Sequence, residues 1–113
     1  MKDALIKILE TFGYPIFLQG SLNDKDSYPD TFFTFWNNSV DDGSHYDDTA
    51  MDYIWNFDLN VYSTNPNLVD SLLLDAKQKL IDSGWIVGGK GYDVFSDEPT
   101  HTGRGMNIFY IET

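Results

Sequence analysis

The chain has 113 residues, 42% of them hydrophobic and 16% aromatic, which is enough apolar material for one folded domain spanning residues 1–113. It contains no cysteine, so disulfide bonds, thiolate metal sites and a cysteine nucleophile are excluded. The 18 acidic and 7 basic residues give a net charge of −11, which argues against direct binding of nucleic acid or of an anionic membrane. No stretch approaches the roughly 18 apolar residues of a membrane span and no secretory signal is recognisable, so synthesis in the cytoplasm is expected.

The first third of the chain predicts one helix and two strands. Four apolar residues recur at the spacing of one helical face: Leu5, Ile8, Leu9 and Phe12. Gly13 and Pro15 are expected to end this helix. Strands are predicted over residues 16–19 and 31–36, and the second has aromatic residues on both faces. We therefore expect one side of this strand to lie in the core and the other to contact a helix or a partner subunit.

The middle of the chain predicts an acidic loop and then a strand with one wet face. Residues 39–49 contain four aspartates and no lysine or arginine, with Gly43 as the expected turn. A solvated surface loop is the usual role of such a segment. Hydrophobic and polar residues alternate over residues 53–62, which predicts a strand that places Trp55 in the core.

A second helix is predicted after this strand. Asn65 is a suitable N-cap and Pro66 a suitable first-turn residue, while Gly84 suits the left-handed conformation beyond the last turn. Between these ends lies one apolar stripe that is expected to be buried: Leu68, Leu72, Leu73, Ala76 and Leu80.

Three strands are predicted to close the chain, over residues 85–87, 92–95 and 106–111. The glycines at 88, 89 and 91 permit a bend between the first two. The order of elements predicts an α+β fold, in which a twisted, mainly antiparallel sheet carries two helices on one face.

Residues 93–104 gather the side chains that are most able to carry chemistry. Ser96, Thr100 or Thr102 could act with His101 and an aspartate as nucleophile and base, but no strand-to-helix elbow accompanies them. The spacing of the candidate metal ligands fits no defined site: His45, Asp93, Asp97, Glu98 and His101. We therefore predict no catalytic residue, no metal ligand and no cofactor, and we expect that the chain is not an enzyme.

Arg104 is the only arginine in the chain, so any bidentate guanidinium contact must use it. One interpretation is an ion pair with Asp93, Asp97 or Glu98 that closes its own hairpin. The alternative is an ion pair with a neighbouring subunit, where Arg104 would fix the register of a ring.

Two segments give the chain a resemblance to a known group of proteins. Residues 62–66 lead into the leucine-striped helix, and residues 97–104 lead into the aromatic strand at 109–111. With the order of elements from Leu5 onward, these segments resemble the tail terminator and neck proteins of long-tailed bacteriophages, a group that includes head–tail joining and tail-completion proteins. The resemblance implies a non-enzymatic virion component of the tail or neck, made in the cytoplasm of the host bacterium.

Members of this group form rings, commonly six-fold, that cap the tail tube and face the head-side connector. The implied partners are further copies of the chain, in a ring such as a hexamer, together with the tail tube protein and the head-side connector protein. The expected subunit or partner contacts are these: Phe32, Trp36, Asp97, Glu98, Thr100, His101 and Arg104. Four acidic residues are expected to face a lumen through which DNA slides: Asp41, Asp42, Asp47 and Asp48.

Two other functions fit the same sequence. A small acidic domain could bind or inhibit a basic partner by mimicking DNA, which the charge distribution permits. A tail-assembly chaperone is the second alternative, because the residues alone do not separate it from a ring component.

Overall fold

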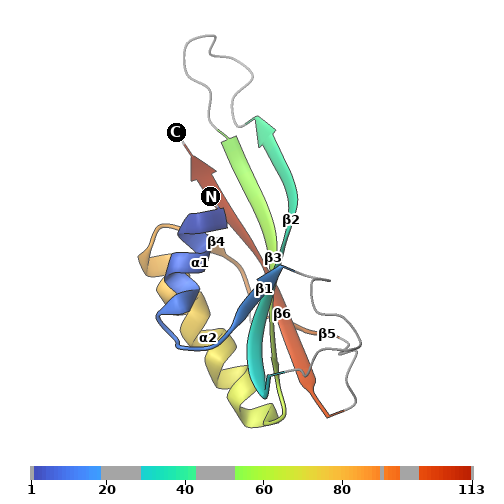
Figure 1. The fold of residues 1–113 in the computed structure, drawn as a ribbon. Coiled ribbons are helices and arrows are strands. Elements are labelled where there is room, and N and C mark those ends of the chain that lie inside the picture. The colour runs from blue at the N-terminus through green and yellow to red at the C-terminus, as the bar shows by residue number, and fades with distance from the viewer. Residues whose placement is uncertain (1, 19–28, 43–52, 90, 95–99, 113) are drawn as a thin grey trace.

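Residues 2–18, 29–42, 53–89, 91–94 and 100–112 are described by a computed structural model of the chain. Two helices and six strands follow one another in these residues (Figure 1): α1 (Lys2–Glu10), β1 (Ile16–Leu18), β2 (Thr31–Asp42), β3 (Tyr53–Ser63), α2 (Pro66–Asp82), β4 (Ile86–Val87), β5 (Tyr92–Val94) and β6 (Thr102–Glu112). The predicted α+β fold, with a mainly antiparallel sheet and both helices on one face, is confirmed.

The strands form one sheet in the order β1-β2-β3-β6-β4, and β5 also pairs with β6. Only the β1–β2 pair is parallel among the described strands. Val87 of β4 pairs with Ile108, and Tyr92 of β5 pairs with Gly105, so the two short strands lie one after the other along β6. Gly89 and Gly91 between them have φ angles of 72° and 88°. The predicted glycine bend is therefore confirmed, since these φ values favour glycine.

The hydrophobic core lies between the sheet and the two helices (Figure 1). We call the side of the sheet that faces α1 and α2 the inner face, and the opposite side the outer face. The inner face contributes these buried residues: Phe33, Phe35, Phe57, Leu59, Val61, Met106 and Ile108. The helices contribute six: Leu5, Leu9, Leu72, Leu73, Ala76 and Leu80. The apolar stripes predicted on both helices thus explain why the helices pack on this face.

The start and end of α2 follow from local chemistry. The side chain of Asn65 accepts a hydrogen bond from the backbone N–H of Asn67, at 3.1 Å, and Pro66 occupies the first turn. Gly84 follows the helix with a φ of 94°, which is accessible mainly to glycine. The predicted start of this helix at Asn65 and Pro66 and its predicted end at Gly84 are therefore confirmed.

Two strands are longer than predicted. β2 continues to Asp42, so residues 39–42 belong to a strand and not to a loop, because they pair with β3 as far as Tyr53. A bulge between Asn37 and Ser39 absorbs one extra residue in that pairing. β6 begins at Thr102 and pairs with the end of β3, which moves Arg104 from the predicted loop into a strand. Cross-strand hydrogen bonding thus outweighs the weak strand preference of aspartate and glycine.

The molecule is elongated, with extents of 51 × 28 × 23 Å and a radius of gyration of 15.1 Å. A compact domain of this length would have a radius of gyration of about 13 Å. Strands β2, β3 and β6 account for part of this length, because they continue past the helices at one end (Figure 1). Trp55 is partly buried and packs against the edge of the core cluster. No helix in the described part of the chain is long and apolar enough to cross a membrane.

Candidate functional site

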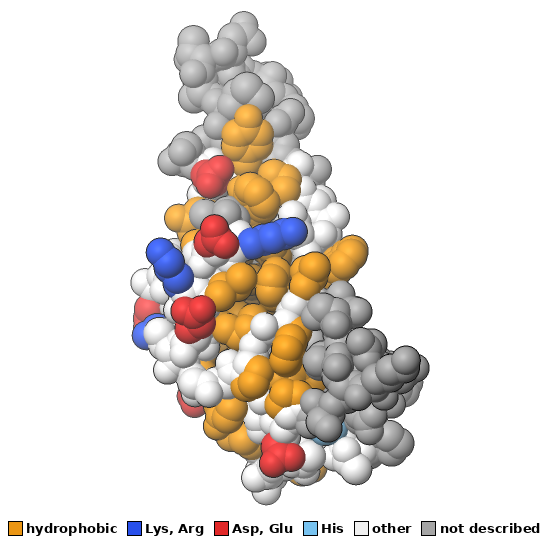
Figure 2. All heavy atoms as spheres, viewed as in Figure 1, with side chains coloured by type: hydrophobic (Ala, Val, Ile, Leu, Met, Phe, Trp, Pro, Cys, Tyr) orange, Lys and Arg blue, Asp and Glu red, His pale blue; other side chains and the backbone are white. Residues whose placement is uncertain are grey.

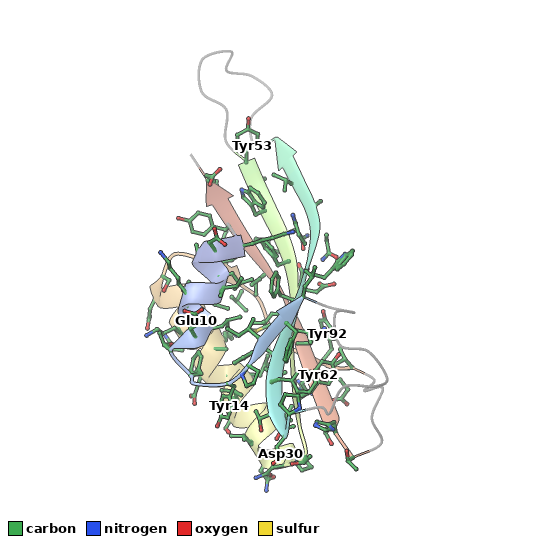
Figure 3. The ribbon with its side chains drawn as sticks, in the orientation of Figure 1. Glu10, Tyr14, Asp30, Tyr53, Tyr62 and Tyr92 are labelled. Carbon is green, nitrogen blue, oxygen red and sulfur yellow. The ribbon has the colours of Figure 1, made fainter. Side chains whose placement is uncertain are left out.

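The outer face of the sheet combines polar side chains with exposed aromatic rings. Strand register places five side chains of neighbouring strands in adjacent rows: Thr34, Trp36, Asp58, Asn60 and Asn107. Tyr62 and Tyr92 lie on the same side, opposite Glu10 and Tyr14 on the helix side (Figure 3). This face is the candidate functional site.

Asn107 is the centre of a hydrogen-bond network on the outer face. Its Nδ2 donates to Asn56 Oδ1 at 2.7 Å and to Asp58 Oδ1 at 3.0 Å. Asn38 Nδ2 also donates to Asn56 Oδ1, at 3.2 Å. Side chains from three neighbouring strands are therefore held in fixed orientations across the sheet.

Tyr92 joins this network from β5. Burial raises the pKa of its phenol above the ordinary value of 10.0, and the negative charge of Asp58 and a hydrogen bond to Asp58 raise the pKa further. Because a carboxylate can only accept, the Tyr92 hydroxyl is the donor. Asp58 therefore receives hydrogen bonds from two neutral side chains, Asn107 and Tyr92.

Two glycines of β6 make room for the side chains above them. A Cβ at Gly105 would overlap Asn60 Oδ1 and lie 3.2 Å from the Tyr92 ring, and a Cβ at Gly103 would lie 2.6 Å from the Tyr62 ring. Asn60 is consequently only 5% exposed although it is polar. The predicted wet face of β3 is thus partly buried, because the glycines let its side chains lie close to the neighbouring strand.

An aromatic cluster closes one end of the outer face. Phe32 stacks on Tyr62 with ring centroids 5.2 Å apart, and it contacts Phe17 and His101 at centroid distances of 5.9 and 5.7 Å. His101 Nε2 lies 2.7 Å from the carbonyl oxygen of Pro29, to which it donates, and Nδ1 lies 3.1 Å from Thr100 Oγ1. His101 therefore ties the start of β6 to the segment that enters β2.

Exposed hydrophobic side chains lie on both sides of the two-layer fold. On the outer face, Trp36 and Tyr92 are 48% and 45% exposed, and Ile86 and Ile111 are 51% and 47% exposed. On the solvent side of α2, Leu74 is 50% exposed. A band of hydrophobic side chains also runs along the length of the molecule in the view of Figure 2. Exposed apolar area of this extent is typical of protein–protein contact surfaces.

The predicted contact residues do not form one site. Phe32 and His101 meet in the aromatic cluster, where Phe32 is buried, and Trp36 lies exposed further along the outer face. Thr100 is exposed beside His101. Asp41 and Asp42 end β2, but their side chains are outside the described structure, as are the following predicted residues: Asp47, Asp48, Asp97 and Glu98.

Arg104 lies on the inner side of the sheet. Its Nη1 is 2.8 Å from Asp93 Oδ1 and its Nε is 3.3 Å from Asp70 Oδ1. The first contact is the ion pair within its own hairpin that the sequence allowed. The second, which the sequence did not indicate, links β6 to α2.

The candidate metal ligands and catalytic residues of the sequence are only partly described by the structure. Within the described ranges, no three histidine, aspartate or glutamate side chains gather closely enough to hold a metal ion. Of the predicted metal candidates, only Asp93 and His101 are described. The Nε2 of His101 donates to a carbonyl oxygen, so in this arrangement that nitrogen is not a free base.

Sequence reasoning missed the Asp58, Asn107 and Tyr92 group. One signal could have indicated it: glycines at 103 and 105 alternate along a strand, which marks close approach of side chains from neighbouring strands. Comparison with models of known protein families and with curated proteins finds no match for this chain.

Proposed function

We propose that this protein is a non-enzymatic structural component of a bacteriophage or prophage virion, which forms a ring that terminates the tail tube or joins the tail to the head. Its partners are then further copies of the chain, the tail tube protein and the head-side connector protein. The resemblance of the sequence to tail terminator and neck proteins supplies the phage role. The proposal of a ring is supported by one observation: two different exposed hydrophobic surfaces lie on opposite layers of the fold.

The first surface lies on the outer face beside β4 and the end of β6. Ile86 pairs with Phe109 and Ile54 pairs with Ile111, so strand register brings these four apolar side chains together. Ile86 and Ile111 are about half exposed. We call these four residues the isoleucine patch.

The second surface lies on α2, away from the sheet. Leu74 and Ile81 are both exposed and are seven residues apart, which places them on one stripe of the helix. The buried residues of α2, such as Leu73 and Leu80, face the sheet instead. We call Leu74 and Ile81 the helix stripe.

Two unlike surfaces support a head-to-tail contact, in which the isoleucine patch of one copy meets the helix stripe of the next. A repeated contact of this kind closes into a ring when the rotation between copies is a whole fraction of a turn. The strands that continue past the helices lengthen the molecule and increase its reach toward a neighbour (Figure 1).

The first test is the mass of the protein in solution, measured by light scattering after size exclusion over a concentration series. We expect a discrete ring-sized species, which Ile111→Glu or Leu74→Glu reduces to monomer because each places a charge in the contact. Lys7→Gln, an exposed substitution on α1, is the control and should leave the mass unchanged. If the ring needs the tail tube, the same variants should instead lose co-sedimentation with purified tubes.

Mixing the two blocked variants identifies the type of contact. In a head-to-tail ring, Ile111→Glu retains an intact helix stripe and Leu74→Glu retains an intact isoleucine patch, so the mixture should form a dimer and nothing larger. A two-fold symmetric contact would instead leave one variant dimeric on its own before mixing, because the variant that keeps that surface intact could pair with itself. A wild-type protein that stays monomeric at every concentration and does not bind tail tubes would refute the proposed function.

A further inference from the structure

Asp58 is the only carboxylate among the outer-face side chains that the structure describes, and no lysine or arginine shares that face with it. Its hydrogen-bond donors are the neutral groups of Asn107 and Tyr92. The ion pairs found between described residues involve Arg104 with Asp70 and Asp93, all away from Asp58. The negative charge of Asp58 is thus oriented by neutral neighbours and is not matched by a cation of the described chain.

Two exposed aromatic side chains flank this carboxylate. Trp36 is directly opposite Asp58 in the pairing of β2 with β3, and Tyr92 reaches Asp58 from the other side through its hydroxyl. Both side chains are close to half exposed, so they present ring surface to solvent next to the carboxylate. Aromatic rings beside a carboxylate form a suitable surface for an organic cation, which gains both a charge pair and a cation–π contact.

The guanidinium of arginine fits this surface better than the ammonium of lysine does. It is planar and weakly hydrated, so it can stack on an indole ring while donating hydrogen bonds to a carboxylate. The chain has one arginine, Arg104, and its ion pairs hold it on the inner side of the sheet. An arginine that reaches Asp58 must therefore come from a different protein.

We propose that Asp58, Trp36 and Tyr92 form a binding site for an arginine side chain of a partner protein. The identity of that partner rests on the proposed function, in which it is the tail tube protein or the head-side connector protein. The site lies on the outer face but does not include the isoleucine patch, so ring formation and partner binding use separate residues. The net charge of −11 favours a basic partner, because it attracts cationic surfaces before contact is made.

The probe is the peptide acetyl-Gly-Arg-Gly-amide, titrated into the full chain while the indole N–H signal of Trp36 is followed by NMR. We expect a saturable shift of this signal at millimolar peptide. The citrulline peptide, which has the same shape without the charge, should bind about tenfold more weakly or not at all. The lysine peptide should bind more weakly than the arginine peptide.

Three variants locate the binding site. Asp58→Asn keeps the shape and the acceptor oxygen but removes the charge, and it should weaken arginine-peptide binding about tenfold. Trp36→Leu should also weaken binding of the arginine peptide. Because this variant lacks the indole signal, its binding is followed by the backbone N–H signal of residue 58. Asp75→Asn removes an exposed carboxylate from α2 and is the matched control, with no change expected.

The inference is overturned if citrulline binds as tightly as arginine, if lysine binds as tightly as arginine, or if Asp58→Asn leaves the affinity unchanged. These outcomes are independent of the ring, because the mass measurement can support assembly while the peptide fails to bind. A protein that binds the arginine peptide but forms no ring and no tube complex would retain the site and refute the proposed function alone.

Discussion

On the inner face of β3, Phe57, Leu59 and Val61 are fully buried beneath the helices, whereas the alternate positions on the outer face are Asn56, Asp58 and Asn60. The inner side chains make non-directional contacts whose stabilising effect depends on the apolar area removed from water. Asn56 and Asp58 accept hydrogen bonds from Asn107 at 2.7 and 3.0 Å, and Gly105 opposite Asn60 leaves room for the Asn60 side chain. The side chains of β3 are therefore held by apolar packing on the inner face and by polar contacts on the outer face.

The outer face also retains features that do not favour stability. Thr34 Oγ1 is buried on this face without a hydrogen-bond partner in the described structure, and Trp36 and Tyr92 leave much of their rings in water. An unpaired buried hydroxyl lowers the free energy of unfolding. The inner face thus maintains the fold through packing, while the outer face holds polar side chains in fixed positions beside exposed aromatic rings.

The largest effect is expected on the inner side, from Leu72→Ala. Leu72 is buried in the core, and its truncation should lower the free energy of unfolding by about 2–5 kcal/mol because a cavity replaces the lost side chain. Leu74→Ala is the matched control, since it makes the same change on an exposed position of the same helix. Denaturant unfolding at low protein concentration measures both variants. Equal losses for the two leucines would show that the division into buried and exposed sides of α2 is wrong.

Gly105→Ala is expected to have the next largest effect, on the outer side. The added methyl group would overlap Asn60 Oδ1, so we expect a loss of about 1–3 kcal/mol in the free energy of unfolding. Gly88→Ala serves as the control, because a Cβ at that position would have no atom within 4 Å. Both variants can be measured by denaturant unfolding.

A double-mutant cycle separates crowding from other effects of the Gly105→Ala change. Asn60→Ala removes the side chain that the new methyl group meets, so the two changes together should cost less than the sum of the separate losses. Additive losses would mean that the glycine is required for a reason other than space for Asn60.

The helices and their buried stripes could be predicted because their signals are local. The 3.6-residue period of α2, the Asn65 cap and Gly84 all act within a few residues of the structure that they produce. The sheet strands were recognised from alternation, but the ends of β2 and β6 were not. Those ends depend on pairing with β3, which adds hydrogen bonds that no local preference reveals.

The candidate site was not predictable in the same way. Asp58, Asn107 and Tyr92 come from three strands, and only the register of β3, β5 and β6 against one another brings them together. The sequence prediction of Trp36 as a contact residue remains untested, although its exposure permits the role. The sequence allows Arg104 an ion pair within its own hairpin or with a neighbouring subunit, but its contact with Asp70 depends on how α2 lies on the sheet.

The smallest expected effect is a shift in the pKa of Tyr92, which tests the polar contacts of the outer face. Burial and the neighbouring Asp58 raise the pKa of Tyr92, so it should ionise above pH 10.0. The difference between wild type and Tyr92→Phe in phenolate absorbance gives the titration of this one residue. Asp58→Asn should move the midpoint downward while burial still keeps it raised. A wild-type midpoint at or below 10.0 would show that Asp58 and Tyr92 do not interact in solution.

The same pKa shift determines how Tyr92 affects stability at alkaline pH. Because the folded chain holds the phenolic proton more tightly than the unfolded chain does, the contribution of Tyr92 to the free energy of unfolding is complete below pH 10.0. It is lost as the pH rises through the raised folded-state pKa. Wild type should therefore lose stability relative to Tyr92→Phe only above pH 10.0, whereas Leu72→Ala should show no such difference from wild type, since an aliphatic core contact does not titrate.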